Sequence, residues 1–170
     1  GDEVVNAVQG AIDTGYRHID TAAIYRNEKG VGKGIKNSGI DRKNIFLTSK
    51  VWNADQGYDS TIKALQTSLG KLGTDYLDLY LVHWPVKGKY KETWRAMEKL
   101  YSEGKVRAIG VSNFMQHHLE DIIRDASIVP MVNQMEFHPS LIQNDLLNFC
   151  AENKIQYEAW SPLMRGDIFS

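Results

Sequence analysis

The sequence is poor in the features that mark secreted, membrane and nucleic-acid-binding proteins. It has a single cysteine, Cys150, so no intramolecular disulfide can form, and no basic-then-apolar signal segment opens it. No apolar run approaches the roughly 18 residues of a membrane span. Twenty Lys plus Arg stand against twenty-one Asp plus Glu, a balance unsuited to neutralising nucleic-acid phosphates. We therefore expect a cytoplasmic protein with no membrane or nucleic-acid partner, and Cys150 in its core.

What is present is the pattern of one globular α/β domain spanning 1–170. The composition, 42% apolar and 24% charged, is ordinary for a folded domain. Short runs of β-branched or aromatic residues alternate with segments in which apolar residues recur at helical spacing. The expected strands lie at 15–22, 44–52, 76–84, 106–114, 131–137 and 155–160. Their starts fall 24 to 32 residues apart with a helix in each gap, which indicates parallel strands joined by right-handed crossovers.

Two architectures fit this alternation, an open doubly wound sheet and a closed (β/α)8 barrel. An open sheet commonly carries a glycine-rich phosphate turn directly after a strand. The nearest candidate, Gly30 to Gly34, lacks that strand, so a closely packed helix is the better interpretation. Barrel enzymes gather polar residues at the C-terminal ends of successive strands. Such residues are present here: Asp20, Lys50, His83, Ser112, Asn113 and Gln134. We therefore favour the barrel.

Three of these polar residues form a candidate catalytic group with Tyr25, which follows Asp20 by five residues. Side chains alternate at period two along a strand, so Asp20, Lys50 and His83 each end one strand face. A lysine there loses several kcal/mol of solvation unless it is paired, and Asp20 on the neighbouring strand is the obvious counter-ion. A lysine cation beside Tyr25 would favour the phenolate and make that hydroxyl a better proton donor. His83 can complete a hydrogen-bonded set around a substrate oxygen, as carbonyl reduction requires.

Six segments together resemble one known family, the aldo-keto reductases, over essentially the whole chain. They are GYRHIDTAAIYRNE (15–28), LTSKVWN (47–53), LDLYLVHWP (77–85), VRAIGVSNF (106–114), NQMEFHP (133–139) and EAWSPL (158–163). The resemblance is nearest to the small-carbonyl reductases of bacteria and protists. It implies a (β/α)8 TIM-type barrel that reduces aldehydes or ketones with NADPH. It also implies a catalytic tetrad of Asp20, Tyr25, Lys50 and His83. Tyr25 would donate the proton, Lys50 and Asp20 would lower its pKa, and His83 would orient the carbonyl.

The same resemblance implies where the cofactor and substrate lie. Ser112, Asn113 and Gln134 would hold the nicotinamide carboxamide, and Asp20 would also contact the cofactor. Trp160 would stack on the nicotinamide, at a position where the family more commonly has tyrosine, and Ser161 and Leu163 would lie along the pyrophosphate. Trp52 and Trp84, close after tetrad positions, are expected to wall the pocket for a small carbonyl substrate. The absence of HxH, HExxH and CxxC spacings predicts no metal site.

The length departs from the family pattern. A complete barrel needs roughly 250 residues, whereas this chain holds about six strands and six helices. Comparison with the family pattern indicates that the first strand and the last two units are absent. Either the chain is the ordered part of a longer protein, which we favour, or it is a fragment that folds by association. The alternative to the reductase is an inactive truncated or silent subunit that binds cofactor or a partner. We expect the complete protein to be a monomer.

Overall fold

Six parallel strands, paired in chain order, form one curled sheet. In the computed structural model, which describes residues 2–169, each strand pairs with the next, and β1 and β6 are the edges. The strands are β1 (His18–Asp20), β2 (Phe46–Val51), β3 (Leu79–Val82), β4 (Ile109–Ser112), β5 (Val132–Glu136) and β6 (Gln156–Trp160). Every strand that the sequence predicts is present, with narrower bounds than expected.

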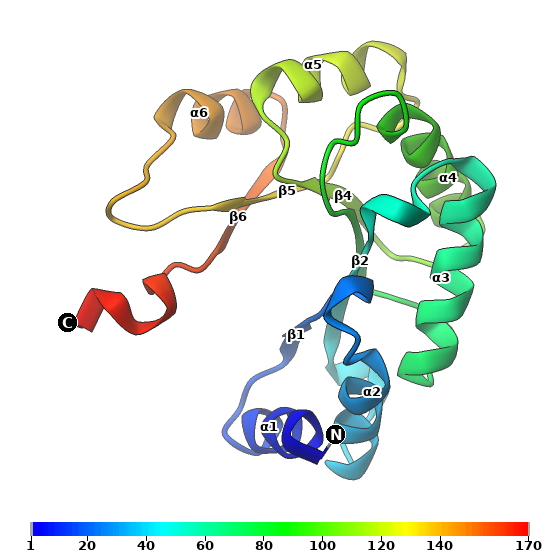
Figure 1. Ribbon diagram of the computed structural model, residues 1–170, viewed down its shortest axis with the longest axis vertical. Helices are drawn as coiled ribbons and strands as arrows, with labels where there is room; N and C mark the ends of the chain where they lie inside the picture. Colours follow the sequence, from blue (N-terminus) through cyan, green and yellow to red (C-terminus); the bar gives the residue numbers. More distant parts are fainter. Residues whose placement is uncertain (1, 170) are drawn as a thin grey trace.

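Helices cover the outer side of this sheet (Figure 1). They are α1 (Asp2–Asp13), α2 (Glu28–Asn37), α3 (Tyr58–Leu72), α4 (Tyr90–Ser102), α5 (Gln116–Asp125) and α6 (Asn144–Glu152). Short 3-10 turns lie at η1 (Ala23–Tyr25), η2 (Arg42–Asn44), η3 (Asn53–Asp55) and η4 (Met164–Phe169). The architecture is that of an incomplete (β/α)8 barrel and not of a doubly wound sheet. Among the described residues, no helix combines the length and the hydropathy that crossing a membrane requires.

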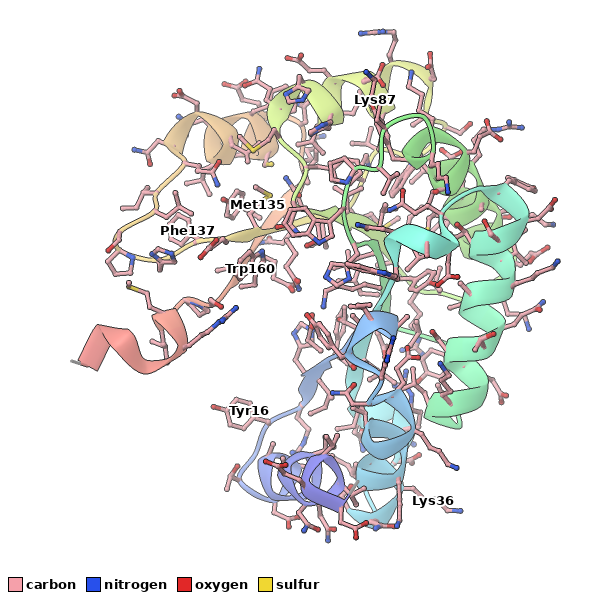
Figure 2. All side chains as sticks on the ribbon, in the orientation of Figure 1. Tyr16, Lys36, Lys87, Met135, Phe137 and Trp160 are labelled. Atoms are coloured by element: carbon pink, nitrogen blue, oxygen red, sulfur yellow. The ribbon has the colours of Figure 1, made fainter. Side chains whose placement is uncertain are left out.

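The alternation of side chains divides each strand between two environments. On β2, Leu47 and Val51 point outward into the core between the sheet and the helices, where Tyr80 and Val82 of β3 join them. Cys150 belongs to the same core and is fully buried, as the sequence predicts. Lysines such as Lys36 and Lys87 extend away from the molecule on its outer surface (Figure 2). The inner, concave face of the sheet is therefore where polar side chains of the strands meet.

Glycine is required where helix α2 packs against its neighbours. A Cβ atom on Gly32 would lie 2.2 Å from the carbonyl oxygen of Leu72 in α3. One on Gly34 would lie 2.9 Å from the carbonyl oxygen of Val5 in α1. The segment 30–34 is thus the interior of a closely packed helix, as the sequence analysis favoured, and not a phosphate loop.

Candidate active site

The strand register brings three of the predicted residues to one end of the concave face. Asp20 pairs with Thr48 on β2, so Lys50 lies two residues farther along that strand. Lys50 pairs with Leu81 on β3, so His83 again lies two residues farther. Because steps of two residues preserve the face of a strand, all three side chains share the concave side. The stagger carries them around the C-terminal edge of the sheet, where barrel enzymes bind substrates.

Lys50 and Asp20 form a salt bridge in which the lysine is almost completely buried. The side chain of Lys50 is 2% exposed and that of Asp20 is 34% exposed. The Lys50 ammonium donates a hydrogen bond to Asp20 Oδ1 and another, 3.1 Å long, to the backbone carbonyl of Thr21. Because burying an ammonium is costly unless it is paired, the Asp20 carboxylate offsets part of the cost of placing Lys50 inside the fold.

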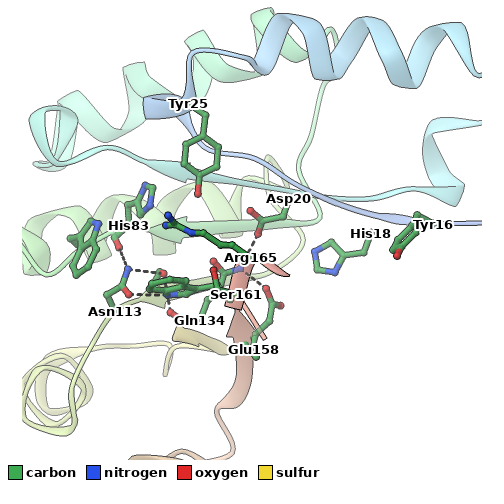
Figure 3. Close-up of a pocket in the computed structure, with 14 residues that line it drawn as sticks. Tyr16, His18, Asp20, Tyr25, His83, Asn113, Gln134, Glu158, Ser161 and Arg165 are labelled. Carbon is green, nitrogen blue, oxygen red and sulfur yellow. Dashed lines mark hydrogen bonds between the residues drawn. The ribbon is translucent and has the colours of Figure 1, made fainter. Parts of the chain in front are cut away.

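Tyr25 ends the 3-10 turn η1, directly after β1. Its ring centroid lies 5.5 Å from Lys50 Nζ and 6.0 Å from the centroid of the His83 ring. Figure 3 shows the Tyr25 hydroxyl directed into the pocket, with His83 on one side and Asp20 on the other. The residue that follows it, Arg26, has a left-handed backbone with φ of 55° and ends the turn. The tetrad implied by the resemblance is therefore gathered in one place.

Burial, followed by the negative charge of Asp20, raises the pKa of Tyr25 above its usual value of 10.0. This is opposite to the expectation that Lys50 and Asp20 together lower it. Burial is the larger cause, and Lys50 does not reverse it, since an ammonium that is already paired with a carboxylate has little net attraction for a phenolate nearby. Tyr25 consequently keeps its proton throughout the neutral pH range.

His83 is an uncharged imidazole at neutral pH. Burial, followed by the positive charge of Lys50, lowers its pKa from 6.5 to about 4, and Asp20 offsets only part of this effect. Its Nδ1 atom is buried and has no hydrogen-bond partner among the described residues. The edge of the Trp52 ring packs against it at a centroid separation of 5.3 Å. His83 is thus available to hydrogen-bond a neutral substrate group without carrying charge.

A cavity of about 700 Å³ opens over these residues. It is lined by Tyr16, His18, Asp20, Tyr25, His83, Trp84, Ser112, Asn113, Gln134, Glu158, Ala159, Trp160, Ser161 and Arg165. This volume lies within the range of about 300 to 1,000 Å³ that is usual for ligand pockets. Most of the predicted cofactor-binding side chains therefore face the same space as Tyr25 and His83.

The far wall of the cavity is a hydrogen-bonded group of amide, hydroxyl and indole side chains. Asn113, in a left-handed conformation with φ of 64°, donates to the His83 carbonyl oxygen at 3.0 Å and to Ser112 Oγ at 3.1 Å. It accepts a 3.0 Å bond from the indole N–H of Trp160. Asparagine tolerates this backbone conformation better than most residues. The bond to the His83 carbonyl oxygen attaches this wall to β3.

The side-chain amide of Gln134 is hydrogen-bonded to two carboxylates. Its amide nitrogen donates to Asp20 Oδ2 at 2.8 Å and to Glu158 Oε1, while Ser112 Oγ donates to its backbone carbonyl. Both N–H bonds of this amide are therefore used within the protein. The side-chain carbonyl oxygen is what Gln134 can still offer to a ligand.

Two of the predicted substrate-pocket and cofactor residues lie outside the cavity, and some of the residues that line it were not predicted. Trp52 does not line the cavity and packs behind His83, whereas Trp84 does line it and is 43% exposed. Leu163 is 54% exposed and also lies outside the lining. Glu158 and Arg165 line the cavity but were not singled out. The period of two along β6, which puts Glu158 on the same face as Trp160, is the signal that identifies the first of them.

One group of side chains in the cavity has the residue types of a metal site. Ligand atoms of His18, Asp20 and Glu158 lie within 4.8 Å of one another. However, Asp20 already accepts hydrogen bonds from Lys50 and Gln134, and Glu158 accepts one from Gln134. A metal would have to displace the Lys50 ammonium or the Gln134 amide from these oxygens. The group is better explained as part of the hydrogen-bond network around the salt bridge.

Comparison with known proteins adds family membership to this geometry. A model described as the aldo/keto reductase family matches residues 1–169. The glyoxal reductase of Bacillus subtilis (strain 168) is 62% identical over 168 residues, which are 99% of this chain and 61% of that protein. The chain thus spans about three fifths of the length of the curated relatives it matches.

Solved structures agree with the fold. The crystal structure of an aldo/keto reductase from Brucella melitensis superposes with a TM-score of 0.94 at 57% identity, covering 96% of this chain and 64% of that one. An aldo-keto reductase of Bombyx mori, solved in complex with NADP, superposes with a TM-score of 0.89 at 41% identity, covering 94% of this chain and 56% of that one.

Proposed function

This chain belongs to the aldo/keto reductase family, and from that membership we propose that the protein reduces aldehydes or ketones to alcohols with NADPH, with Tyr25 as the proton donor. Two findings on relatives support this proposal. One similar protein is named a glyoxal reductase, which makes a small carbonyl compound the first substrate to test. Another was solved in complex with NADP.

The observation that carries the proposal is the protonated phenol of Tyr25 in the cavity beside an uncharged His83 and the buried Lys50–Asp20 salt bridge. Carbonyl reduction places negative charge on the substrate oxygen, so it needs a proton donor within reach of that oxygen. A phenol whose pKa is raised holds its proton until that charge develops. The Lys50–Asp20 salt bridge lies beside it, with Lys50 Nζ 5.5 Å from the centroid of the Tyr25 ring.

The fit of the cofactor rests on the wall formed by Ser112, Asn113, Gln134 and Trp160. A carboxamide donates hydrogen bonds through its NH2 group, and the side-chain carbonyl oxygens of Asn113 and Gln134 can accept them. The indole of Trp160, fixed by its bond to Asn113, offers a flat face for a ring to stack on. When bound, NADPH supplies the hydride that adds to the carbonyl carbon. Tyr25 then gives its proton to the carbonyl oxygen, which His83 holds by a hydrogen bond.

The decisive variant is Tyr25→Phe, which removes the hydroxyl and keeps the ring. In the full-length protein we expect it to lose NADPH-dependent reduction of glyoxal by about a hundredfold or more, the usual contribution of a positioned acid. NADPH binding, followed by quenching of tryptophan fluorescence, should stay close to the parental value. Tyr76→Phe is the matched control, because that ring lies between Arg42 and Arg107 at the other end of the sheet. Parental turnover in Tyr25→Phe would reject Tyr25 as the acid.

A further inference from the structure

The turn that carries Tyr25 is held at both ends by two consecutive residues of β2. At its start, the Lys50 ammonium donates to the carbonyl oxygen of Thr21 at 3.1 Å. At its end, Ser49 Oγ donates to Glu28 Oε1 at 2.7 Å. Because neighbouring residues of a strand point to opposite faces, Lys50 holds the segment from the concave side and Ser49 holds it from the helix side. Residues 21–28 are thus attached to β2 from both faces of the sheet.

A third hydrogen bond closes the segment on itself. Thr21 Oγ1 donates to Asn27 Oδ1 at 2.6 Å, which joins the residue after β1 to the residue before α2. Thr21 is completely buried and Asn27 is partly buried, so this bond is partly shielded from water. The 3-10 turn that ends in Tyr25 lies between the two partners. The Thr21–Asn27 hydrogen bond therefore closes the backbone of this turn into a small loop.

Glu28 is an unexpected residue at this place. It is 1% exposed, its Oε2 atom has no hydrogen-bond partner among the described residues, and the nearest cation, Lys71 Nζ, is 4.0 Å away. Burying a carboxylate costs several kcal/mol, and a well-packed apolar residue is often at least as stable. The position of Glu28 as the first residue of α2 offsets part of that cost through the helix dipole. Packing alone does not explain why a carboxylate stands here.

We propose that Glu28 is a positioning residue, which acts through Ser49 and together with the Thr21–Asn27 bond to hold the Tyr25 hydroxyl over the reacting atoms. The inference rests on the proposed function, since it assigns Glu28 a role only if Tyr25 is the proton donor. A displacement of about 1 Å at a catalytic group can lower a rate about a hundredfold. A ring of three hydrogen bonds, two of them buried and one partly buried, restricts displacements of that size.

The test uses Glu28→Gln and Thr21→Val in the full-length protein. The first variant removes the charge and weakens the bond to Ser49, and the second removes one hydroxyl and keeps the shape. Each should lower kcat for glyoxal by about tenfold or more, the effect of weakened positioning, with the affinity for NADPH unchanged. In the double variant, kcat should fall by less than the product of the two single fold-decreases, because both substitutions act on the same turn. Asp78→Asn is the matched control.

Asp78 suits that purpose because it is a second buried carboxylate, 4% exposed, which accepts a hydrogen bond from the Leu47 N–H at the opposite end of the sheet. Its substitution should lower the melting temperature and leave kcat unchanged. If Glu28→Gln and Thr21→Val turn over at the parental rate while Tyr25→Phe is inactive, Glu28 has no positioning role and the proposed function stands. If Tyr25→Phe is active, the proposed function fails and this inference fails with it.

Discussion

The Lys50–Asp20 salt bridge should respond asymmetrically to the removal of its two partners. Asp20→Asn leaves the Lys50 ammonium 2% exposed and without a counter-ion. Lys50→Met replaces the ammonium by an apolar chain of similar length and leaves Asp20, whose side chain is 34% exposed and bonded to Gln134, in contact with water. Asp20→Asn therefore leaves a buried charge without a partner, whereas Lys50→Met does not.

The sizes of the two effects follow from burial. Removing one partner of a buried pair costs about 3 to 5 kcal/mol, and the partial exposure of Asp20 reduces this to about 2 to 4 kcal/mol for Asp20→Asn. For Lys50→Met the expected change in the free energy of unfolding is within about 1 kcal/mol, because the lost attraction is offset by the desolvation that no longer occurs. The Thr21 carbonyl loses its donor in that variant, which prevents a net gain.

Urea unfolding of the two single variants and the double variant measures these terms as a cycle. Lys50→Met should rescue most of the stability that Asp20→Asn loses, because it removes the stranded ammonium. Both single variants should be inactive in carbonyl reduction, so stability and activity separate in Lys50→Met. Equal losses of stability in the two single variants, with additive losses in the double variant, would show that the ammonium is not buried at an energetic cost and would refute the reasoning.

The remaining predictions concern the pH dependence of turnover, the pH dependence of stability and two glycine substitutions. The pH profile of kcat for reduction should be flat from pH 6 to pH 8 and fall only above about pH 10, because the pKa of Tyr25 is raised and the reaction needs its proton, while His83 titrates at about 4. Since the unfolded chain protonates His83 more readily, unfolding experiments should also show stability falling as the pH decreases from 6.5 toward 4. Gly32→Ala should lower the melting temperature by several degrees, because its Cβ would lie 2.2 Å from the Leu72 carbonyl oxygen. Gly10→Ala, with no atom within 4 Å of the new Cβ, should be neutral or stabilising by up to about 1 kcal/mol.

Periodicity in the sequence was enough to predict the charged part of the site. Because strand side chains alternate strictly, the spacing of Asp20, Lys50 and His83 from their strand starts fixed the face on which each lies. The positions of the strands followed from the same reasoning, since a helix between successive strands requires parallel pairing. What periodicity could not give was the exact stagger between strands, which the register in the structure supplies.

The electrostatic state of Tyr25 could not be predicted in the same way. The sequence identified a cation near the phenol, but it showed neither the burial of the phenol, which is the larger cause of the raised pKa, nor the degree to which Asp20 neutralises that cation. Trp52 was misplaced for a related reason. It lies beyond the end of β2, where the chain enters the turn η3 and the alternation of side chains no longer applies. Both differences arise where contacts with residues distant in the sequence decide the environment of a side chain.

The site also depends on the curvature of the sheet. Asp20, Lys50 and His83 lie in or directly after β1 to β3, whereas the amide and indole side chains of the wall lie in or directly after β4 to β6. The Gln134–Asp20 hydrogen bond, 2.8 Å long, joins strands that are four positions apart in the sheet. In a flat sheet four strand spacings would separate those strands by about 19 Å. Asp20 and Gln134 therefore meet only because the sheet curls. For this reason the proposed chemistry requires a barrel-like arc and not simply six correctly paired strands.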